Sequence, residues 1–427
     1  MNDFVQIYRQ LKDCEPVEAE AASERADLPW RDFAPRDDGP EDHRESQEPR
    51  RDGERLPTPF AWRDPESIPS RPWVYGRHLI RKQVSVTVAP GGVGKSSLTI
   101  CEALAMASGR ELLGEWTEKD LKVWIYNLED QEDELDRRIV AAMQHHQVSF
   151  REIDGRLFRD TGRNRALCTA IQSRGGIHIV QPEMRALERE IKARSIDVLV
   201  VDPCVSSHQV SENDNGAIDL VAKEWARLAD RCNCAIELVH HTRKTNGEEA
   251  TTEAGRGAYS LLAAARSGRV LNKMSDEMKK DAGIEKDNST YFSIARDKAN
   301  LAPMGARTWC RMASVQLANG DNVGVAELWA WPDAFDGVSL ADLLAVQQAV
   351  EHRVQEGRPP RLSDQAGNEW VGVVVANVLG LDPEADRKRL KKLLGTWLKT
   401  EALIKESRLD ATRRPRPCVV VGEWATA

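Results

Sequence analysis

The residue types best suited to chemistry lie in one stretch within the first quarter of the chain. The stretch reads APGGVGKSS, which is Ala89, Pro90, Gly91, Gly92, Val93, Gly94, Lys95, Ser96 and Ser97. Glycines let the backbone curl with its N–H groups facing an anion, where β-carbons would obstruct them. A lysine placed after them can reach the β- and γ-phosphates of a nucleotide, and the next hydroxyl can bind the Mg²⁺ that neutralises those phosphates. The stretch therefore predicts a binding loop for ATP and Mg²⁺, with Lys95 and Ser96 as the groups in contact.

The segments on either side are those that a phosphate-binding loop needs. Residues 83–90 read QVSVTVAP, in which valines alternate with smaller polar residues as in a strand. Residues 96–108 read SSLTICEALAMAS, a good helix former that Gly109 closes. Strand, turn and helix together place the positive end of the helix beneath the phosphates. Ala89 stands where the GxxxxGK[ST] pattern has its first glycine, and since alanine is small, this weakens the match only slightly.

Three further apolar runs each end in polar residues. Residues 121–130 read LKVWIYNLED, residues 195–203 read SIDVLVVDP, and residues 234–244 read CAIELVHHTRK. Apolar strands that alternate with helical segments, such as residues 217–232, predict an α/β fold with a mainly parallel central sheet flanked by helices. Ligands of such sheets bind at the carboxyl ends of the strands, which is where each run has its polar residues.

The polar residues at these strand ends have the types that phosphate hydrolysis needs. Asp202 closes an apolar strand and would hold Mg²⁺ from the side opposite Ser96. Glu129 would orient, or take a proton from, the water that attacks the γ-phosphate. Strand alternation favours Glu129 over the adjacent Asp130, which remains an alternative. The histidine pair that ends the third run either senses the γ-phosphate or is an ordinary strand-end group.

The order of the segments is more specific than any one of them. APGGVGKSS, NLED, VLVVDP and LVHHTRK are followed by GRGAYSLLAAARSGRV and ARDKANLAP. This series resembles that of RecA-like ATPases of the plasmid RepA type, which are close relatives of hexameric DnaB-like replicative helicases. The same motifs recur in phage-borne AAA family ATPases. The resemblance covers roughly residues 60–328.

The resemblance implies a RecA-like P-loop ATPase core and assigns roles to the residues at matching positions. It implies that Lys95 and Ser96 lie at the phosphates and Mg²⁺. It also implies that Glu129 is the catalytic glutamate and that Asp202 is the Walker B aspartate. The second histidine of the pair, His241, would sense the γ-phosphate.

The resemblance further implies a homo-oligomer, a hexameric ring in which each active site is completed by its neighbour. Arg266 would be the arginine finger that reaches into the adjacent subunit's site. Because such an arginine neutralises transition-state charge across an interface, hydrolysis would depend on assembly. Arg256, Arg269 and Lys298 are the other basic candidates for this role.

Two polar loops would face the channel of such a ring. They follow the second and third apolar runs, at residues 205–217 and 242–258, and since both contain glycine we expect them to be mobile. Their carboxylates are Glu212, Asp214, Glu248, Glu249 and Glu253. Binding of a phosphate backbone calls for a positively charged groove, so this acidity argues against processive unwinding. It leaves ATP hydrolysis unaffected.

The sequence changes character after Pro332. A helix is expected to end at Gly380, and a second helix to start with Asp382 as its N-cap. The second helix has an apolar stripe, and a hairpin with a basic turn follows it. Helix, basic helix and basic hairpin resemble a winged helix, which would bind DNA. The basic residues concerned are Arg387, Lys388, Lys391 and Lys392 on the helix, and Arg413 and Arg414 in the turn.

The composition of the sequence limits the domain organisation and the classes of protein that remain possible. Residues 1–57 are rich in charge and proline and are expected to be mostly disordered, before an ATPase domain at 58–332 and a winged-helix-like domain at 333–427. A net charge of −8 excludes a histone-like polycation. The eight cysteines form no CxxC pair, which makes a zinc site improbable. Without an apolar signal core or a run of 18 apolar residues, the sequence predicts a soluble, cytoplasmic protein and no membrane contact.

These features predict an ATP-hydrolysing RecA-like motor that acts on DNA in phage or plasmid replication, of the RepA helicase type. The main alternative is a non-helicase ATPase, a switch or loader that binds DNA through its C-terminal domain. A DNA-binding regulator with a degenerate ATPase domain is a second alternative, against which the intact Lys95, Glu129 and Asp202 argue. A small-molecule kinase would fit the phosphate loop alone, but not the HHTRK segment or the basic hairpin.

Overall fold

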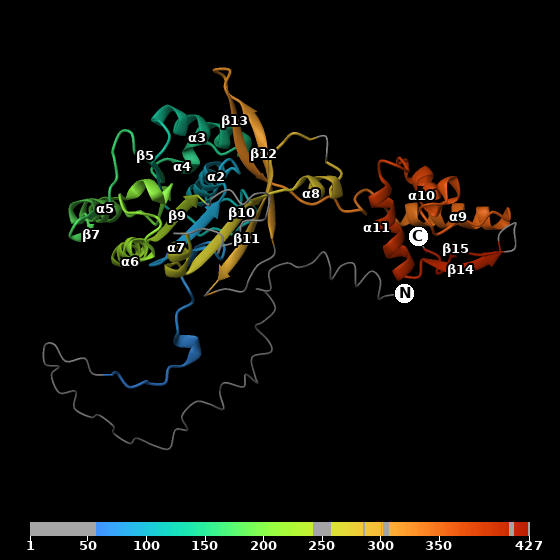
Figure 1. The fold of residues 1–427 in the computed structure, drawn as a ribbon, viewed down its shortest axis with the longest axis horizontal. Helices are drawn as coiled ribbons and strands as arrows, with labels where there is room; N and C mark the ends of the chain where they lie inside the picture. Colours follow the sequence, from blue (N-terminus) through green and yellow to red (C-terminus); the bar gives the residue numbers. More distant parts are fainter. Residues whose placement is uncertain are drawn as a thin grey trace, which may run out of the picture. The chain divides into compact units, whose positions relative to one another are not determined.

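The computed structural model describes residues 57–241, 258–284, 287–299, 301, 307–409 and 414–425 (Figure 1). The chain divides into a unit of residues 1–71 and a larger unit of residues 72–427. In the first unit the described residues include one 3-10 turn, η2 (Pro65–Ser67), in which Asp64 accepts a hydrogen bond from the backbone of Glu66. The expected disorder of residues 1–57 concerns a segment that lies almost wholly outside the described residues.

The larger unit is built around a sheet that has nine strands within the described residues. Their order is β13-β12-β11-β10-β3-β9-β8-β4-β5. The parallel strands are β3 (Val84–Ala89), β4 (Val123–Asn127), β5 (Leu157–Thr161), β8 (Val198–Asp202), β9 (Ala235–His241) and β10 (Ser267–Lys273). The antiparallel extension is β11 (Tyr291–Ala299), β12 (Thr308–Gln316) and β13 (Asn322–Leu328). The α/β class and the mainly parallel central sheet are as the sequence predicts.

Helices cover both faces of this sheet because its strands are apolar on both sides. In β4, Val123 and Ile125 join one hydrophobic core, whereas Trp124 and Tyr126 join the other. The first core includes side chains of α2 (Lys95–Ser108), α3 (Glu132–His146) and α4 (Phe150–Ile153). The second includes side chains of α5 (Gln181–Arg194), α6 (Asn215–Cys232) and α7 (Ala258–Ala264).

Smaller elements complete the larger unit. Two hairpins, β1 (Trp73–Tyr75) with β2 (Leu79–Ile80) and β6 (Ala170–Ser173) with β7 (Gly176–Ile179), lie outside the main sheet. The helix α8 (Asp276–Asp281) connects β10 to β11. The turn η3 (Cys204–Ser207) follows β8.

The loop after β8 is anchored, which differs from the mobility expected of it. The hairpin β6–β7 docks on this loop, and the backbone amide of Gln209 donates to the carbonyl of Ala170 at 2.7 Å. The amide of Thr169 donates to the carbonyl of Ser207, also at 2.7 Å, and Val210 is buried. These backbone contacts satisfy polar groups that a free loop would leave to water. Most of the second loop, residues 242–257, lies outside the described residues.

The C-terminal residues form a core of their own, which includes Val346, Val371, Leu390 and Trp397. Its elements are α9 (Leu340–Gln355), η4 (Gly367–Glu369), α10 (Val371–Leu379), α11 (Arg387–Lys399), β14 (Leu403–Leu409) and β15 (Pro415–Val421). The expected basic helix begins later than the sequence suggests. Asp382 accepts the amides of Glu384 and Ala385 and closes a separate turn, so α11 starts only at Arg387.

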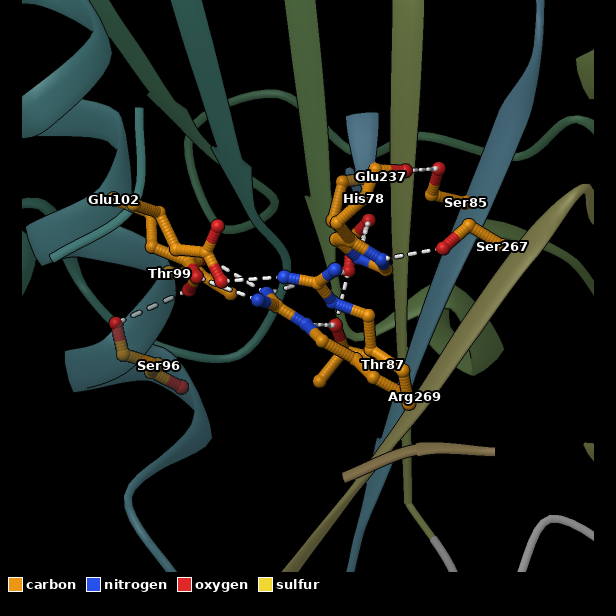
Figure 2. A network of polar contacts seen from close by, with 11 residues as sticks. His78, Ser85, Thr87, Ser96, Thr99, Glu102, Glu237, Ser267 and Arg269 are labelled. Atoms are coloured by element: carbon orange, nitrogen blue, oxygen red, sulfur yellow. Dashed lines mark hydrogen bonds and ion pairs between the residues drawn. The ribbon is translucent and has the colours of Figure 1, made fainter. Parts of the chain in front are cut away.

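A buried network of polar and charged side chains ties α2 to three neighbouring strands (Figure 2). Arg269 of β10 donates to both carboxylate oxygens of Glu102 in α2, each at 2.6 Å, and from Nε to the hydroxyl of Thr87 in β3 at 2.7 Å. Thr87 donates in turn to Glu237 of β9, whose other carboxylate oxygen lies 2.9 Å from Nε2 of His78. None of the five residues is more than 5 % exposed. The network therefore fixes the relative positions of the elements that flank the phosphate loop.

The protonation of this network follows from its burial. Burial lowers the pKa of His78 from its ordinary 6.5, and the neighbouring positive charge of Arg269 lowers it further. Among the described residues, Arg269 is the arginine that forms ion pairs with both Glu102 and Glu237. A buried carboxylate without a cation is costly, so the network depends on this arginine.

Replacement of this arginine tests the network. Arg269→Met should lower the free energy of unfolding by about 3–5 kcal/mol, because two buried carboxylates lose their counterion. Denaturant unfolding measures the change. The matched control is Arg266→Met, three residues earlier and exposed, which should change stability by less than about 0.5 kcal/mol. Equal stability of the two variants would contradict the structural role of Arg269.

Candidate active site

The phosphate loop has the backbone shape that an anion requires. Gly94 is the N-cap of α2, and the φ angles of Gly92 and Gly94 are +74° and +110°, in the region that favours glycine. A β-carbon built on Gly91 or Gly92 would meet nothing within 4 Å, so the loop borders open space there. At Gly94 a β-carbon would lie 2.8 Å from the sulfur of Met312. This glycine therefore also allows β12 to approach the loop.

Lys95 is a buried ammonium with no carboxylate within 4.0 Å in the part of the chain that the structure describes. Its residue is 5 % exposed, and burial lowers its pKa. Its Nζ lies 3.3 Å from the carbonyl of Pro90 and 3.4 Å from that of Ala89, and it donates to Nδ1 of His241 at 2.9 Å. These neutral acceptors leave the charge uncompensated. A phosphate would supply the missing anion, so Lys95 fits its assigned ligand.

Asp202 and Ser96 fit a bound Mg²⁺. Asp202 is 4 % exposed and lies beside the side chain of Ser96. Burial raises the pKa of Asp202 to about 6, against the lowering effects of Ser96 and then of Lys95. Among the described residues no cation lies within 4.0 Å of this carboxylate. A hydroxyl and a carboxylate are the oxygen ligands that Mg²⁺ prefers, and the ion would neutralise phosphate charge there.

The structure separates the two neighbouring acidic residues at the end of β4. Asp130 accepts a hydrogen bond from the amide group of Asn127 at 3.0 Å and lies 3.5 Å from Nε of Arg138. Glu129 instead has Oε1 3.7 Å from Nε2 of His241. Of the two carboxylates, Glu129 thus faces the phosphate loop, as the alternation of the strand suggests.

The two histidines at the end of β9 have different surroundings. His241 accepts from Lys95 through Nδ1, so its Nε2 carries the proton and faces Glu129. His240 is 6 % exposed, and its Nε2 lies 3.7 Å from Glu212. Burial, followed by the neighbouring His241 and His208 and then by Lys95, lowers the pKa of His240 to about 4. Of the pair, His241 links the lysine to the glutamate, and His240 is a neutral buried group.

The hydroxyl of Ser97 does not face the phosphate loop. It donates to the carbonyl of Gly324 at 3.0 Å and accepts from the amide of Ala326 at 2.8 Å, both in β13. Its expected contact with nucleotide is therefore limited to the backbone. Sequence reasoning could not find this contact because the two segments lie more than two hundred residues apart.

Arg266 lies at the opposite edge of the sheet from its own phosphate loop. Its backbone amide donates to the carbonyl of Val84, the first residue of β3, whereas the loop follows Ala89 at the other end of that strand. A role for Arg266 in hydrolysis therefore needs a second subunit. Arg269 is buried in its ion pair and cannot reach a neighbour. Arg256 and the side chain of Lys298 lie outside the described residues.

The basic face expected on α11 is largely paired with carboxylates. Asp364 forms ion pairs with both Lys391 and Arg387, the latter at 3.4 Å. Lys388 forms an ion pair with Asp281. These contacts reduce the positive charge that the helix presents.

Of the other predicted DNA-binding residues, two lie within the described part of the chain. Lys392 has no ion pair within the described residues and is exposed. Arg414 is exposed just before β15, and Arg413 lies outside the described residues.

Among the described residues no helix is both long and apolar enough to cross a bilayer.

A family model and several solved structures are similar to parts of this chain. Residues 48–247 match the family model described as an AAA domain. A KaiC-like protein from the hyperthermophilic archaeon Pyrococcus horikoshii OT3 is similar at 12 % identity, over 59 % of this chain and 91 % of that one, with a TM-score of 0.36. A RadB recombinase is similar at 13 % identity, over 55 % and 88 %, with a TM-score of 0.36.

A third similar structure is a DnaB-like replicative helicase that interacts with primase. Its identity is 12 %, and the match covers 55 % of this chain and 56 % of that one, with a TM-score of 0.41. This chain thus matches little more than half of that helicase. The AAA domain match includes the phosphate loop, Glu129, Asp202 and His241. The α/β fold with its mainly parallel sheet, together with this match, is that of an ATP-hydrolysing P-loop enzyme.

Substitution of each acidic residue tests which one is catalytic. Glu129→Gln should bind ATP but release phosphate about 10²–10⁴ times more slowly, because the shape remains and the base is lost. Asp130→Asn is the matched control and should keep turnover within a few fold. Phosphate release and nucleotide binding are measured for both variants. A slow Asp130→Asn beside an active Glu129→Gln would reverse the assignment.

The low pKa of His240 predicts a dependence of stability on pH. Its folded pKa of about 4 lies below the ordinary 6.5, so between these values the unfolded chain binds more protons. The free energy of unfolding should therefore fall as pH drops from 6.5 to 4, by on the order of 3 kcal/mol from this group. Urea unfolding of His240→Gln should show a shallower pH dependence, and that of the exposed control His178→Gln should not. Parallel curves for all three proteins would refute the assignment.

Proposed function

We propose that this chain is an ATP-driven motor that acts on DNA in phage or plasmid replication, as a cytoplasmic protein of the RepA helicase type. The observation that carries the proposal is the contact of His241 with both Lys95 and Glu129. It connects the phosphate-binding lysine, the candidate catalytic carboxylate and the end of β9. The series of motifs from APGGVGKSS to ARDKANLAP supports the RepA type.

The geometry suggests how these residues respond to nucleotide. Lys95 is held by loop carbonyls and His241, and a γ-phosphate would compete with them for its ammonium. His241 would then lose a hydrogen bond and could donate from Nε2 to the phosphate instead. Glu129 would orient the attacking water and accept its proton. Since residue 242 begins the second predicted channel loop, the state of His241 would pass directly to that loop.

The proposal includes a ring, because Arg266 cannot serve its own site. Its place at the amino ends of the strands leaves the site of an adjacent subunit as its target. A transition-state arginine supplied in this way couples hydrolysis to assembly. The homo-oligomer is proposed to be hexameric, from the resemblance to DnaB-like helicases.

The proposal places duplex contacts in the C-terminal domain. Helix, helix, helix and hairpin follow one another there, which is the element order of a winged helix. Exposed ion pairs such as those of Lys388 and Lys391 are worth only about 0–1 kcal/mol, so phosphates can replace their carboxylates. Lys392 and Arg414 would add to such a surface.

A mixing experiment tests the shared site. Arg266→Ala should bind ATP normally and hydrolyse it on the order of 10³ times more slowly, and Lys95→Ala should be inactive. A mixture of the two should regain part of the activity, because some interfaces pair an intact loop with an intact arginine. Phosphate release and particle mass are measured on the same mixture. Mixed particles without activity would contradict an arginine supplied by the neighbour.

A non-helicase switch or loader is the second candidate function. The ion pairs on α11 and the acidic residues Glu212 and Asp214 of the first loop favour it, because both weaken the grip on phosphate. Displacement of one strand from a forked duplex separates the two functions. ATP turnover that rises with single-stranded DNA but displaces no strand would favour the switch.

A further inference from the structure

The segment between β5 and the middle of α5 contains a group of arginines that form no ion pair within the described residues. Residues 162–189 contain five arginines and two glutamates, and no lysine or aspartate. The arginines are Arg163, Arg165, Arg174, Arg185 and Arg189, and all five are exposed. None of them lies within 4.0 Å of a carboxylate in the part of the chain that the structure describes. The segment therefore carries uncompensated positive charge.

Arginines on either side of the segment behave differently. Arg156 forms an ion pair with Asp120 at 2.7 Å, and Arg159 forms one with Asp136 at 2.5 Å. Arg194 pairs with Glu190 at 3.1 Å within α5. A protein of net charge −8 thus has enough carboxylates to pair its arginines, yet pairs none of these five within the described residues.

Backbone contacts place this segment at the carboxyl edge of the sheet, the edge of the active site. The amide of Gly162 donates to the carbonyl of Asn127 at the end of β4, at 2.7 Å. Nε of Arg163 donates to the backbone carbonyl of Glu129 at 3.2 Å. The hairpin β6–β7 then meets the loop after β8, where Ile171 bridges to Gln209. The segment runs across the ends of β5, β4 and β8, and Arg174 lies at the hairpin turn between β6 and β7.

We infer that Arg163, Arg165 and Arg174 form a surface that binds the phosphate backbone of single-stranded nucleic acid. Guanidinium groups match phosphate oxygens with two parallel donors, and within the described residues no carboxylate lies close enough to compete for them. The adjacent loop after β8 is acidic, so the hairpin docked on it supplies the positive charge that the predicted channel loop lacks. The inference rests on the proposed action on DNA and adds the surface of contact to it.

A pair of matched double variants tests this surface. Arg165→Gln with Arg174→Gln removes two charges from it. Arg77→Gln with Arg151→Gln removes two equally exposed arginines that also lack an ion pair in the described residues, from the β1–β2 turn and from α4. Binding of a fluorescent oligothymidine to the full chain is measured as a function of KCl concentration, together with ATP turnover in the absence of DNA.

The surface variant should bind the oligothymidine on the order of tenfold more weakly at low salt. Its slope of log affinity against log salt should fall by about 1.4, because each lost phosphate contact removes about 0.7 for a single strand. The control variant should match the wild type in both respects. Both should keep the ATP turnover measured without DNA. Arg165→Lys with Arg174→Lys should restore the slope, because the charge is kept.

The remaining outcomes separate the inference from the proposed function. If the wild type binds the oligothymidine and the surface variant keeps its affinity and slope, the inference fails while action on DNA stands. If the wild type binds no nucleic acid at any salt concentration, both fail. If binding is unchanged but the surface variant alone loses particle mass, these arginines contact an acidic surface of a second copy, and the inference is overturned.

Discussion

The ion pair between Arg269 and Glu102 is the interaction on which the rest of the ATPase core depends. It joins the helix that follows the phosphate loop to the strand β10 (Figure 2). Thr87 and Glu237 extend it to the strands that end in the loop and in His241. Because these elements carry the catalytic groups at their ends, one buried arginine sets the distances between groups that never touch it.

Burial also explains why the site is prepared for its ligands. Lys95 and Asp202 are both shielded from water, and neither has an oppositely charged partner within 4.0 Å in the described residues. Each is costly in isolation, and a phosphate or a divalent cation would relieve that cost. The fold therefore keeps the Lys95 ammonium and the Asp202 carboxylate without close partners of opposite charge. A phosphate would supply the partner of Lys95, and a divalent cation would supply that of Asp202.

The sequence predicts those parts of the site that depend on residues close to one another along the chain. The phosphate loop and the polar strand ends follow from periods of two and 3.6 residues and from glycine at fixed positions. The partners of Glu102 and Ser97 could not be predicted, because pairing depends on which strands become neighbours. A charged residue inside an apolar run, such as Glu237, is a signal that could have indicated a buried network, although the sequence analysis did not use it. The late start of α11 was missed because Asp382 caps a turn as well as it would cap a helix.

The bonds between Ser97 and β13 have a mechanical consequence. The hydroxyl accepts and donates across the same short stretch of strand, and His146 of α3 bonds the carbonyl of Ala326 at 2.9 Å. Hydrogen bonds from Ser97 and His146 thus join the helix after the phosphate loop and the helix α3 to the same strand of the outer hairpin. A displacement of the helix after the phosphate loop would therefore carry β13 and α3 with it.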